Sequence, residues 1–256
     1  HINYNNIYDN PDGFLNEVAS VTIEAEYYWW GDASGPTHSG NPGGTGAAVS
    51  DNVDYDPWLS GQWHGFGLVH NLTNDTYYGS IQDAIDAATG TTIEVGAGTY
   101  NERLTIDKSI TLLGAQAGVD PTPSGARTDT SAESIITEAG LSTPNPDVLE
   151  EITSGITGCV VIDGFTICNA AEDSGICVTG GSDLVVTNNE IRDCRTGISL
   201  ALTKEHVISD VRVESNYFEG NHNGIIWMSG SNIAIRDNTF MHYDIGIHID
   251  MFWESI

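Results

Sequence analysis

Basic side chains are scarce in this sequence, and their scarcity excludes several classes of function. The 256 residues include 8 Lys and Arg against 36 Asp and Glu, for a formal net charge of −28 at pH 7. Proteins that bind nucleic acid or anionic lipid present basic surfaces to the phosphate groups. We therefore expect no nucleic-acid partner, and a surface that suits solvent or bound divalent cations.

Long apolar runs are also absent. No stretch approaches the roughly 18–20 apolar residues that a membrane-spanning helix needs, so no membrane span is expected. The chain is nevertheless 39% hydrophobic, which is enough to bury a sizeable core in one large domain. It begins at His1 with neither an initiator Met nor a secretion signal, and we expect it to be a processed or excised piece.

What the sequence does contain is one pattern in three copies, whose Asn residues are 27 and 22 positions apart. The copies read Leu184, Val186, Asn189 and Ile191; Val211, Val213, Asn216 and Phe218; and Ile233, Ile235, Asn238 and Phe240. A repeat of this length with alternating apolar residues indicates a solenoid of β-strands, with one coil per repeat. Each Asn would lie at a bend, tolerate left-handed backbone angles, and bond to the Asn one coil away.

A Gly-Ile pair keeps the same spacing, at Gly175, Gly197, Gly224 and Gly246. Together the two markers predict an all-β chain folded as a parallel β-helix. One short helix is expected at its start, because Ser80 is a good N-cap and Ile81, Ala84 and Ile85 share one face. Residues 77–256 would thus form a capping helix and the main body of the β-helix.

The segment that follows Tyr77 carries a specific resemblance. Residues 78–85, Gly98-Thr99-Tyr100 and residues 110–114 resemble the opening of a pectin-lyase-like right-handed parallel β-helix. The later coils resemble the Asn-ladder repeats of that superfamily. The tract from Trp30 to Trp58 is similar to the closing segment of β-helix domains in large surface proteins of methanogenic archaea and some bacteria. The resemblance implies a right-handed helix at a cell surface.

The two ends of the sequence fit the same pattern. If Ile256 were followed by His1, there would be 18 residues from Asn238 to Ile256 and 5 more to Asn5, a step that matches the repeat. We therefore expect residues 1–30 to be the final coils of a β-helix in permuted or swapped order. The helix would be that of the same chain or of a neighbouring copy, and the copy is favoured. The alternative is that the coils of residues 1–30 merely resemble the C-terminal coils and do not continue them.

Such head-to-tail contacts, if they do not close on themselves, build filaments or tubes. The residues predicted to form them are Ile2, Asn5, Ile7, Ile235, Asn238, Phe240 and Ile256.

Residues 31–76 are predicted to be a loop-rich linker and end cap, because Gly, Pro, Ser and Asn are frequent there. Its aromatic residues would form a lid, or else a platform for a sugar ring. Calcium prefers oxygen ligands on flexible loops. The candidate ligands are Asp32, Asp51, Asp54 and Asp56. Asn71-Leu72-Thr73 and Asn74-Asp75-Thr76 both fit the N-glycosylation pattern.

Cysteine is limited to four residues, Cys159, Cys168, Cys177 and Cys194. Their spacings match no zinc site. Cys168 and Cys194 would lie near one bend of neighbouring coils, which permits a disulfide in an extracellular protein. Buried free thiols are the alternative, and the spacing does not decide between them.

No catalytic group recurs from coil to coil. Members of the resembled superfamily that cleave acidic polysaccharides use clustered carboxylates. The positions two before and four after each template Asn place no two carboxylates on neighbouring coils. Arg236 beside Glu214 is expected to be an exposed ion pair of little weight. We expect no catalytic residue and no cofactor apart from calcium, so an enzyme is the less favoured interpretation.

Two functions remain. The first is a structural repeat unit of an extracellular cell-surface assembly, such as an S-layer, sheath or filament, in which copies of a glycoprotein join head to tail. The second is an enzyme or adhesin that acts on polysaccharide, with its site in residues 114–158 or among the linker aromatics. The acidic surface, the two triplets and the matching ends favour the first.

Overall fold

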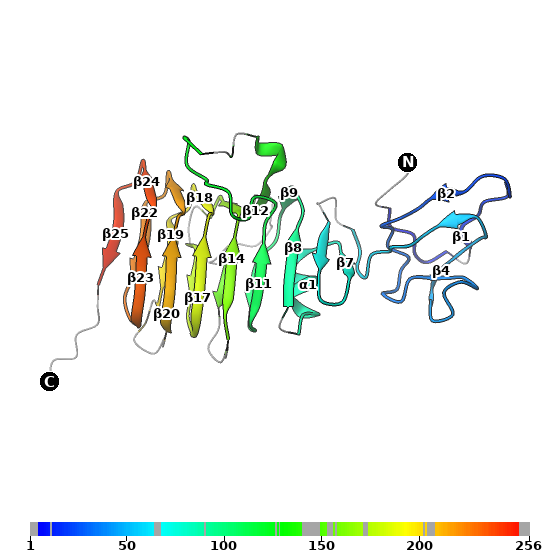
Figure 1. Ribbon diagram of the computed structural model, residues 1–256, viewed down its shortest axis with the longest axis horizontal. Coiled ribbons are helices and arrows are strands. Elements are labelled where there is room, and N and C mark those ends of the chain that lie inside the picture. The colour runs from blue at the N-terminus through cyan, green and yellow to red at the C-terminus, as the bar shows by residue number, and fades with distance from the viewer. Residues whose placement is uncertain are drawn as a thin grey trace.

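The computed structural model describes residues 5–10, 12–63, 68–89, 91–125, 127, 129–139, 149–152, 156, 158–170, 174–201, 203 and 208–250. Of residues 91 and 149–152 it describes the backbone only. Figure 1 shows a small unit at one end of the molecule and a long stack of strands that ends at β25.

The long stack is a parallel β-helix with three sheets, which we name A, B and C. Sheet A contains β6 (Val69–Asn71), β7 (Thr76–Tyr78), β8 (Thr91–Val95), β11 (Ile110–Leu113), β14 (Val160–Asp163), β17 (Gly181–Thr187), β20 (Ile208–Glu214) and β23 (Ser231–Arg236). Sheet B contains β9 (Gly98–Tyr100), β12 (Ser134–Thr137), β15 (Phe165–Cys168), β18 (Glu190–Arg192), β21 (Tyr217–Glu219) and β24 (Thr239–Met241). Sheet C contains β10 (Leu104–Ile106), β13 (Leu149–Ile152), β16 (Ser174–Val178), β19 (Thr196–Leu200), β22 (Asn223–Trp227) and β25 (Ile245–Ile249).

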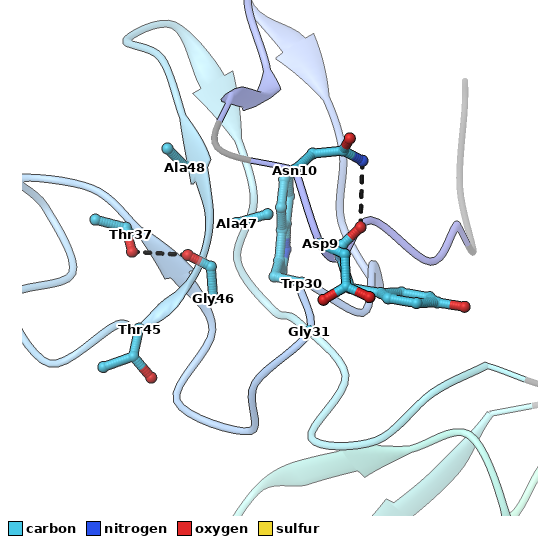
Figure 2. Close-up of a pocket in the computed structure, with 10 residues that line it drawn as sticks. Asp9, Asn10, Trp30, Gly31, Thr37, Thr45, Gly46, Ala47 and Ala48 are labelled. Carbon is cyan, nitrogen blue, oxygen red and sulfur yellow. Dashed lines mark hydrogen bonds between the residues drawn. The ribbon is translucent and has the colours of Figure 1, made fainter.

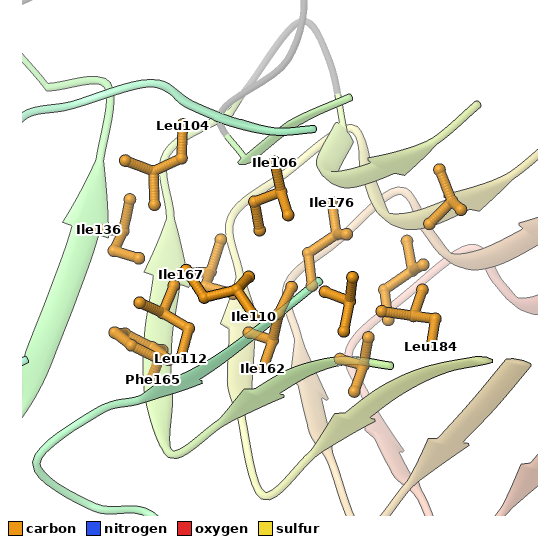
Figure 3. Packing of buried hydrophobic residues seen from close by; sticks show 14 of the residues in the cluster. Leu104, Ile106, Ile110, Leu112, Ile136, Ile162, Phe165, Ile167, Ile176 and Leu184 are labelled. Atoms are coloured by element: carbon orange, nitrogen blue, oxygen red, sulfur yellow. The ribbon is translucent and has the colours of Figure 1, made fainter. Parts of the chain in front are cut away.

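The template residues lie in register from coil to coil, as predicted. Leu184 pairs with Val211, and Val211 pairs with Ile233. On sheet B, Phe218 pairs with Phe240, and their rings stack at 4.7 Å. Because alternate residues of a strand face opposite sides, each column fills one row of the core. Figure 3 shows this packing between the first coils, where side chains of all three sheets meet.

The predicted helix is present as α1 (Ile81–Asp86). The Ser80 hydroxyl oxygen accepts from the Asp83 N–H at 3.1 Å, so the N-cap is confirmed. The Glu102 carboxylate satisfies two more N–H groups of the first turn, those of Ile81 and Gln82, at 3.0 Å each. The apolar face of α1 is fully buried in the first coil. The helix therefore closes one end of the core.

Between β11 and β12 the chain leaves the solenoid, passes through the short helix η1 (Thr130–Ala132), and returns (Figure 1). Arg127 holds this insertion down. Its guanidinium is 1% exposed, bonds to the Glu133 carboxylate, and donates to the Asn188 carbonyl at 2.9 Å. A buried guanidinium that bonds to both a carboxylate of the insertion and the Asn188 carbonyl fixes the insertion against the coil that carries Asn188.

Residues 5–10 and 12–59 form the small unit, with β1 (Asp12–Phe14), β2 (Ile23–Glu24), β3 (Pro36–Thr37), β4 (Gly46–Val49) and β5 (Val53–Asp54). β4 pairs in parallel with β1 and β3, and β2 pairs in parallel with β5. The unit has its own core of Ala25, Tyr28, Trp30, Val49 and Val53. Residues 36–54, expected to be linker, therefore supply three of its strands.

The small unit does not fold back onto β25 of its own chain, which corrects one of the two arrangements considered for residues 1–30. It contacts the opposite end of the β-helix through a parallel bridge between Leu59 and Tyr77 and through the rings of Tyr27 and Tyr77. The physical reason is that β4 and β5 already provide residues 12–24 with parallel partners and a core. Docking on a neighbouring copy stays a prediction.

Candidate assembly site at the two ends of the solenoid

The Asn residues of the repeat form a hydrogen-bonded ladder between sheets A and B, as predicted. The Asn189 amide donates to Oδ1 of Asn216 at 3.1 Å, and the Asn216 amide donates to Oδ1 of Asn238 at 3.0 Å. The backbone N–H groups of Asn189 and Asn216 also donate to Oδ1 one coil on, at 3.0 and 2.9 Å. Phe165 begins the ladder, since its N–H donates to Asn189 Oδ1.

The left-handed backbone at this corner belongs to the residue before each Asn, and not to the Asn as expected. The φ angle is +50° at Asn188, +58° at Ser215 and +56° at Asp237. A second corner follows each strand of sheet B, where Asp193 and His242 also have positive φ. The ladder Asn thus keeps an ordinary backbone and uses its side chain to link the coils.

The last coil leaves core positions open to solvent. Ile225 in β22 is fully buried, whereas its partner Ile247 in β25 is 42% exposed. In the neighbouring core column Leu200 is fully buried and Ile249 is 54% exposed. Because β23, β24 and β25 are the end strands of sheets A, B and C, this edge of the solenoid is uncovered by any described residue (Figure 1).

The Asn ladder also ends here, without the bond that the Asn238 N–H would donate to a side-chain oxygen of a further coil. The Asn238 amide donates to the carbonyls of Val213 and Arg236, and its Oδ1 accepts from Asn216. Within the described part of the chain, no further side-chain oxygen lies where the N–H of Asn238 would continue the ladder. The three predicted assembly residues Ile235, Asn238 and Phe240 therefore lie together at one uncovered end.

The partners predicted for them lie in the small unit at the opposite end. Among the described strands β1 pairs only with β4, and β2 only with β5, so each has a free edge. Asn5 is exposed and Ile7 is half-buried against the core of the unit. Burial raises the pKa of Tyr28, and a hydrogen bond with the Asn5 side chain opposes that rise. Ile2 and Ile256 lie outside the described residues.

The four candidate calcium ligands are not brought together. The Asp32 carboxylate accepts from the N–H and hydroxyl of Ser34, which lowers its pKa. Asp51 bonds to His38 at 3.1 Å, while Asp54 and Asp56 are exposed elsewhere on the unit. Within the described ranges no three acidic, His or Cys side chains are placed to hold a metal ion.

A hollow of about 460 Å³ opens on the same unit beside Trp30, and Figure 2 shows Asp9 and Asn10 on one wall and Thr37 and Gly46 on the other. Thr37 donates to the Gly46 carbonyl at 2.7 Å. The Trp30 indole is fully buried, and its N–H has no partner among the described residues. Trp30 therefore supports the small unit from inside and presents no exposed face to a sugar ring.

The two glycosylation triplets differ in accessibility. Asn71 is 1% exposed, and its side-chain oxygen accepts from the Thr73 N–H at 3.0 Å. Asn74 is exposed in the turn between β6 and β7. The folded structure is compatible with a glycan on Asn74 and not on Asn71.

The cysteines are free thiols in the structure, and the predicted bond between Cys168 and Cys194 is not formed. Both are buried, and burial raises the pKa of Cys194 to about 12. Their thiols are therefore protonated at neutral pH and shielded from solvent, which matches the alternative of buried free thiols.

Carboxylates do gather on the outer face of sheet B, at positions one and three after the Asn that were not considered from the sequence. Glu190 and Arg192 bond at 3.0 Å, and Glu219 lies in the next coil opposite Arg192. Desolvation raises the pKa of Glu190 although Arg192 and Arg127 oppose this. On sheet A, Glu214 and Arg236 form the predicted ion pair, with a bond of 2.6 Å.

Within the described residues, no helix is long and apolar enough to cross a membrane. Neither the curated proteins nor the solved structures that were compared include a match to the chain. Residues 151–251 match the family model described as the right handed beta helix region. This match and the three-sheet geometry support the pectin-lyase-like superfamily, and the fold is an all-β, right-handed parallel β-helix.

Proposed function

We propose that this chain is a structural repeat unit of an extracellular cell-surface assembly, such as an S-layer, sheath or filament, in which β-helices join head to tail. The observation that carries the proposal is the uncovered coil of β23, β24 and β25. Its core columns are continuous with the buried columns behind it, yet its outer side faces solvent.

The end coil has a substantial free energy to gain from a partner. Burying the exposed part of Ile247 or Ile249 would contribute about 1 kcal/mol each. Ile233, Ile235 and Phe240 are also only partly buried. Among the described strands, each end strand also has only one neighbour, and an unpaired strand edge is a template for another strand. Together these terms favour association of the end coil with a surface of matching geometry.

The remaining features support a structural role at the surface of a cell. A net charge of −28 keeps long filaments solvated and discourages sideways association. An exposed Asn74 triplet suits a glycoprotein. Head-to-tail contacts between different ends of one chain do not close on themselves unless the rotation permits, so they generate filaments.

The proposal is tested by sedimentation velocity of the purified chain over a concentration series. Wild type should associate into species that grow with concentration, and Ile247→Lys should remain monomeric. Leu72→Lys is the matched control, because Leu72 is 43% exposed on the β6–β7 turn, at the opposite end of sheet A from β23. A wild-type chain that stays monomeric at all concentrations, or equal loss of association in both variants, would refute the proposal.

A second candidate function is action on an acidic polysaccharide, favoured by the Glu190, Arg192 and Glu219 cluster beside the insertion. A half-buried carboxyl with a raised pKa next to a guanidinium can exchange protons with a bound sugar. A lyase assay with acidic polysaccharides would show turnover that Glu190→Gln abolishes. Turnover unchanged in that variant, or absent altogether, would remove this candidate.

A further inference from the structure

One column of glycines in the β-helix includes a position where no contact among the described residues requires a glycine. Glycine recurs at the start of the strands of sheet C because the coil that follows leaves no room for a side chain. A Cβ on Gly175 would lie 2.9 Å from the Gly197 carbonyl oxygen, and one on Gly197 would lie 2.6 Å from that of Gly224. Gly224 is confined in the same way by Gly246.

Gly246 is the last glycine of the column, and no coil among the described residues follows it. The three atoms nearest to a Cβ there all belong to the Tyr243 side chain, at 3.2 to 3.6 Å, and none is a backbone atom of a neighbouring coil. Its φ is not among the positive values that would require glycine. The constraint that explains the other three glycines is therefore missing at Gly246 within the described part of the chain. A further coil stacked on β25 would supply it.

The first coil of the small unit has the backbone geometry that this position needs. In the β-helix, the residue after each ladder Asn donates its N–H to the carbonyl of the previous Asn: Tyr217 to Asn189 and Thr239 to Asn216, both at 2.9 Å. Trp29 donates in the same way to the Asn5 carbonyl, also at 2.9 Å. Asn5 thus occupies a ladder position in its own coil, 23 residues before Tyr28 and one before the bridge of Asn6 with Trp29.

The turns of this coil match as well. Asp9 lies four residues after Asn5 and has a φ of +60°, as Asp193 has +57° four residues after Asn189. Gly13 is the second residue of β1, as Gly246 is the second residue of β25. A Cβ on Gly13 would lie 2.8 Å from the Ala48 carbonyl oxygen on the paired strand β4. Residues 5–10 and 12–14 therefore reproduce one corner-to-corner segment of the β-helix, and among the described strands β1 pairs on one side only.

We propose that residues 5–14 of a second copy of this chain cover the end coil, in the register Asn238–Asn5, Phe240–Ile7 and Gly246–Gly13. The inference rests on the head-to-tail function proposed above and names its partner and its register. The N–H of Asn238 donates to Oδ1 of the incoming Asn5, and the incoming Asn6 N–H donates to the Asn238 carbonyl. Phe240 packs on the incoming Ile7, and Ile247 packs on the incoming Phe14.

This register predicts one pair of residues that can be cross-linked. Met241 and Tyr8 lie three positions after Asn238 and Asn5, and both are exposed. Directly paired residues of neighbouring strands are about 4.8 Å apart, which suits a disulfide. The double variant Tyr8→Cys/Met241→Cys should therefore form disulfide-linked dimers and longer species on oxidation. Leu15→Cys/Met241→Cys, in which both cysteines are again exposed, should not.

A tandem chain of two full copies, joined Ile256 to His1, removes the dependence on concentration. With Met241→Cys in the first copy and Tyr8→Cys in the second, it should form an intramolecular disulfide. Failure of both cross-links in a chain that assembles would overturn the register and leave the head-to-tail function standing. A cross-link in the tandem together with no association of separate chains would support the register and refute assembly of separate copies.

Gly246→Ala provides an independent readout. The variant should fold with little change in thermal stability, because the Tyr243 ring that its Cβ would meet is 42% exposed and can shift. It should associate at least about tenfold more weakly than wild type. Gly43→Ala is the control, since no atom lies within 4 Å of a Cβ at that position. Equal association of Gly246→Ala and wild type would overturn the proposal.

Discussion

Replacing Asn216 by Ala tests whether the ladder holds the coils together. Asn216 lies in the middle of the ladder and is fully buried. Its amide donates to the carbonyls of Val186 and Glu214 and to Asn238 Oδ1, at 2.8 to 3.0 Å. Its oxygen accepts from the backbone and side chain of Asn189, at 3.0 and 3.1 Å. The alanine variant loses all five bonds. The groups that formed them with Asn216 are buried or partly buried, so solvent replaces the lost bonds at most in part.

The expected loss follows from the partners that are left unpaired. A typical net hydrogen bond contributes about 0.5–1.5 kcal/mol, and a buried group left unpaired costs about 1–3 kcal/mol. Because neighbouring groups relax in part, we expect the free energy of unfolding to fall by about 3 kcal/mol. Asn238→Ala should cost about 1 kcal/mol, since water at the open end replaces some of the lost partners.

Urea denaturation followed by circular dichroism measures the difference between the two variants. The Asn216→Ala midpoint should fall well below that of Asn238→Ala, with similar slopes, because both variants expose the same surface on unfolding. The pair is matched in residue type, position in the coil and substitution. Two midpoints that both differ from wild type by less than the error, or by equal amounts, would refute the view that the buried amides link the coils.

Three further outcomes are expected. Glu190→Gln should be more stable than wild type at neutral pH, because burial raises the pKa of Glu190 and its charged form therefore opposes folding. The difference in stability should vanish as the pH falls through the raised pKa to below the ordinary value of 4.5. Thermal scans across pH that show a constant difference would contradict this. In a glycosylating host, Asn74→Gln should lower the mass of the protein and Asn71→Gln should not, whereas a shift confined to Asn71→Gln would contradict the burial argument. Calcium is predicted to tighten the assembly of this acidic chain, and unchanged melting temperature and sedimentation across a calcium and EDTA series would rule that out.

The sequence pattern was sufficient to predict the strands of sheets A and B and their register. Each template position recurs with an apolar side chain, and the core requires the same type of residue in every coil. The Asn ladder was predictable for the same reason, since Asn216 must match the residues in the coils on both sides. The sequence did not predict that the left-handed backbone belongs to Asn188 and not to Asn189. The residue with positive φ at this corner can be Asn, Ser, Asp or Gly, so no single residue type marks it.

The small unit could not be predicted from the sequence in the same way. Its strands are two to four residues long, so alternation has no length over which to appear. The Gly- and Pro-rich composition of residues 36–54 predicted loop, but pairing with β1 and β2 gives them parallel partners and a core. Glu190 and Glu219 were missed because they occupy outward positions, where residue type is free to change between coils. A comparison of the positions one and three residues after each ladder Asn would have found both carboxylates.

Hydrogen exchange at different protein concentrations tests the central claim most directly. Backbone amides of residues 231–250 and of residues 5–14 should become protected together as the concentration rises, while β14, β17 and β20 keep the same protection throughout. Such joint protection is expected only if the first coil of one copy covers the last coil of another. Protection of residues 231–250 that is independent of concentration, or a change there without one in residues 5–14, would contradict the account.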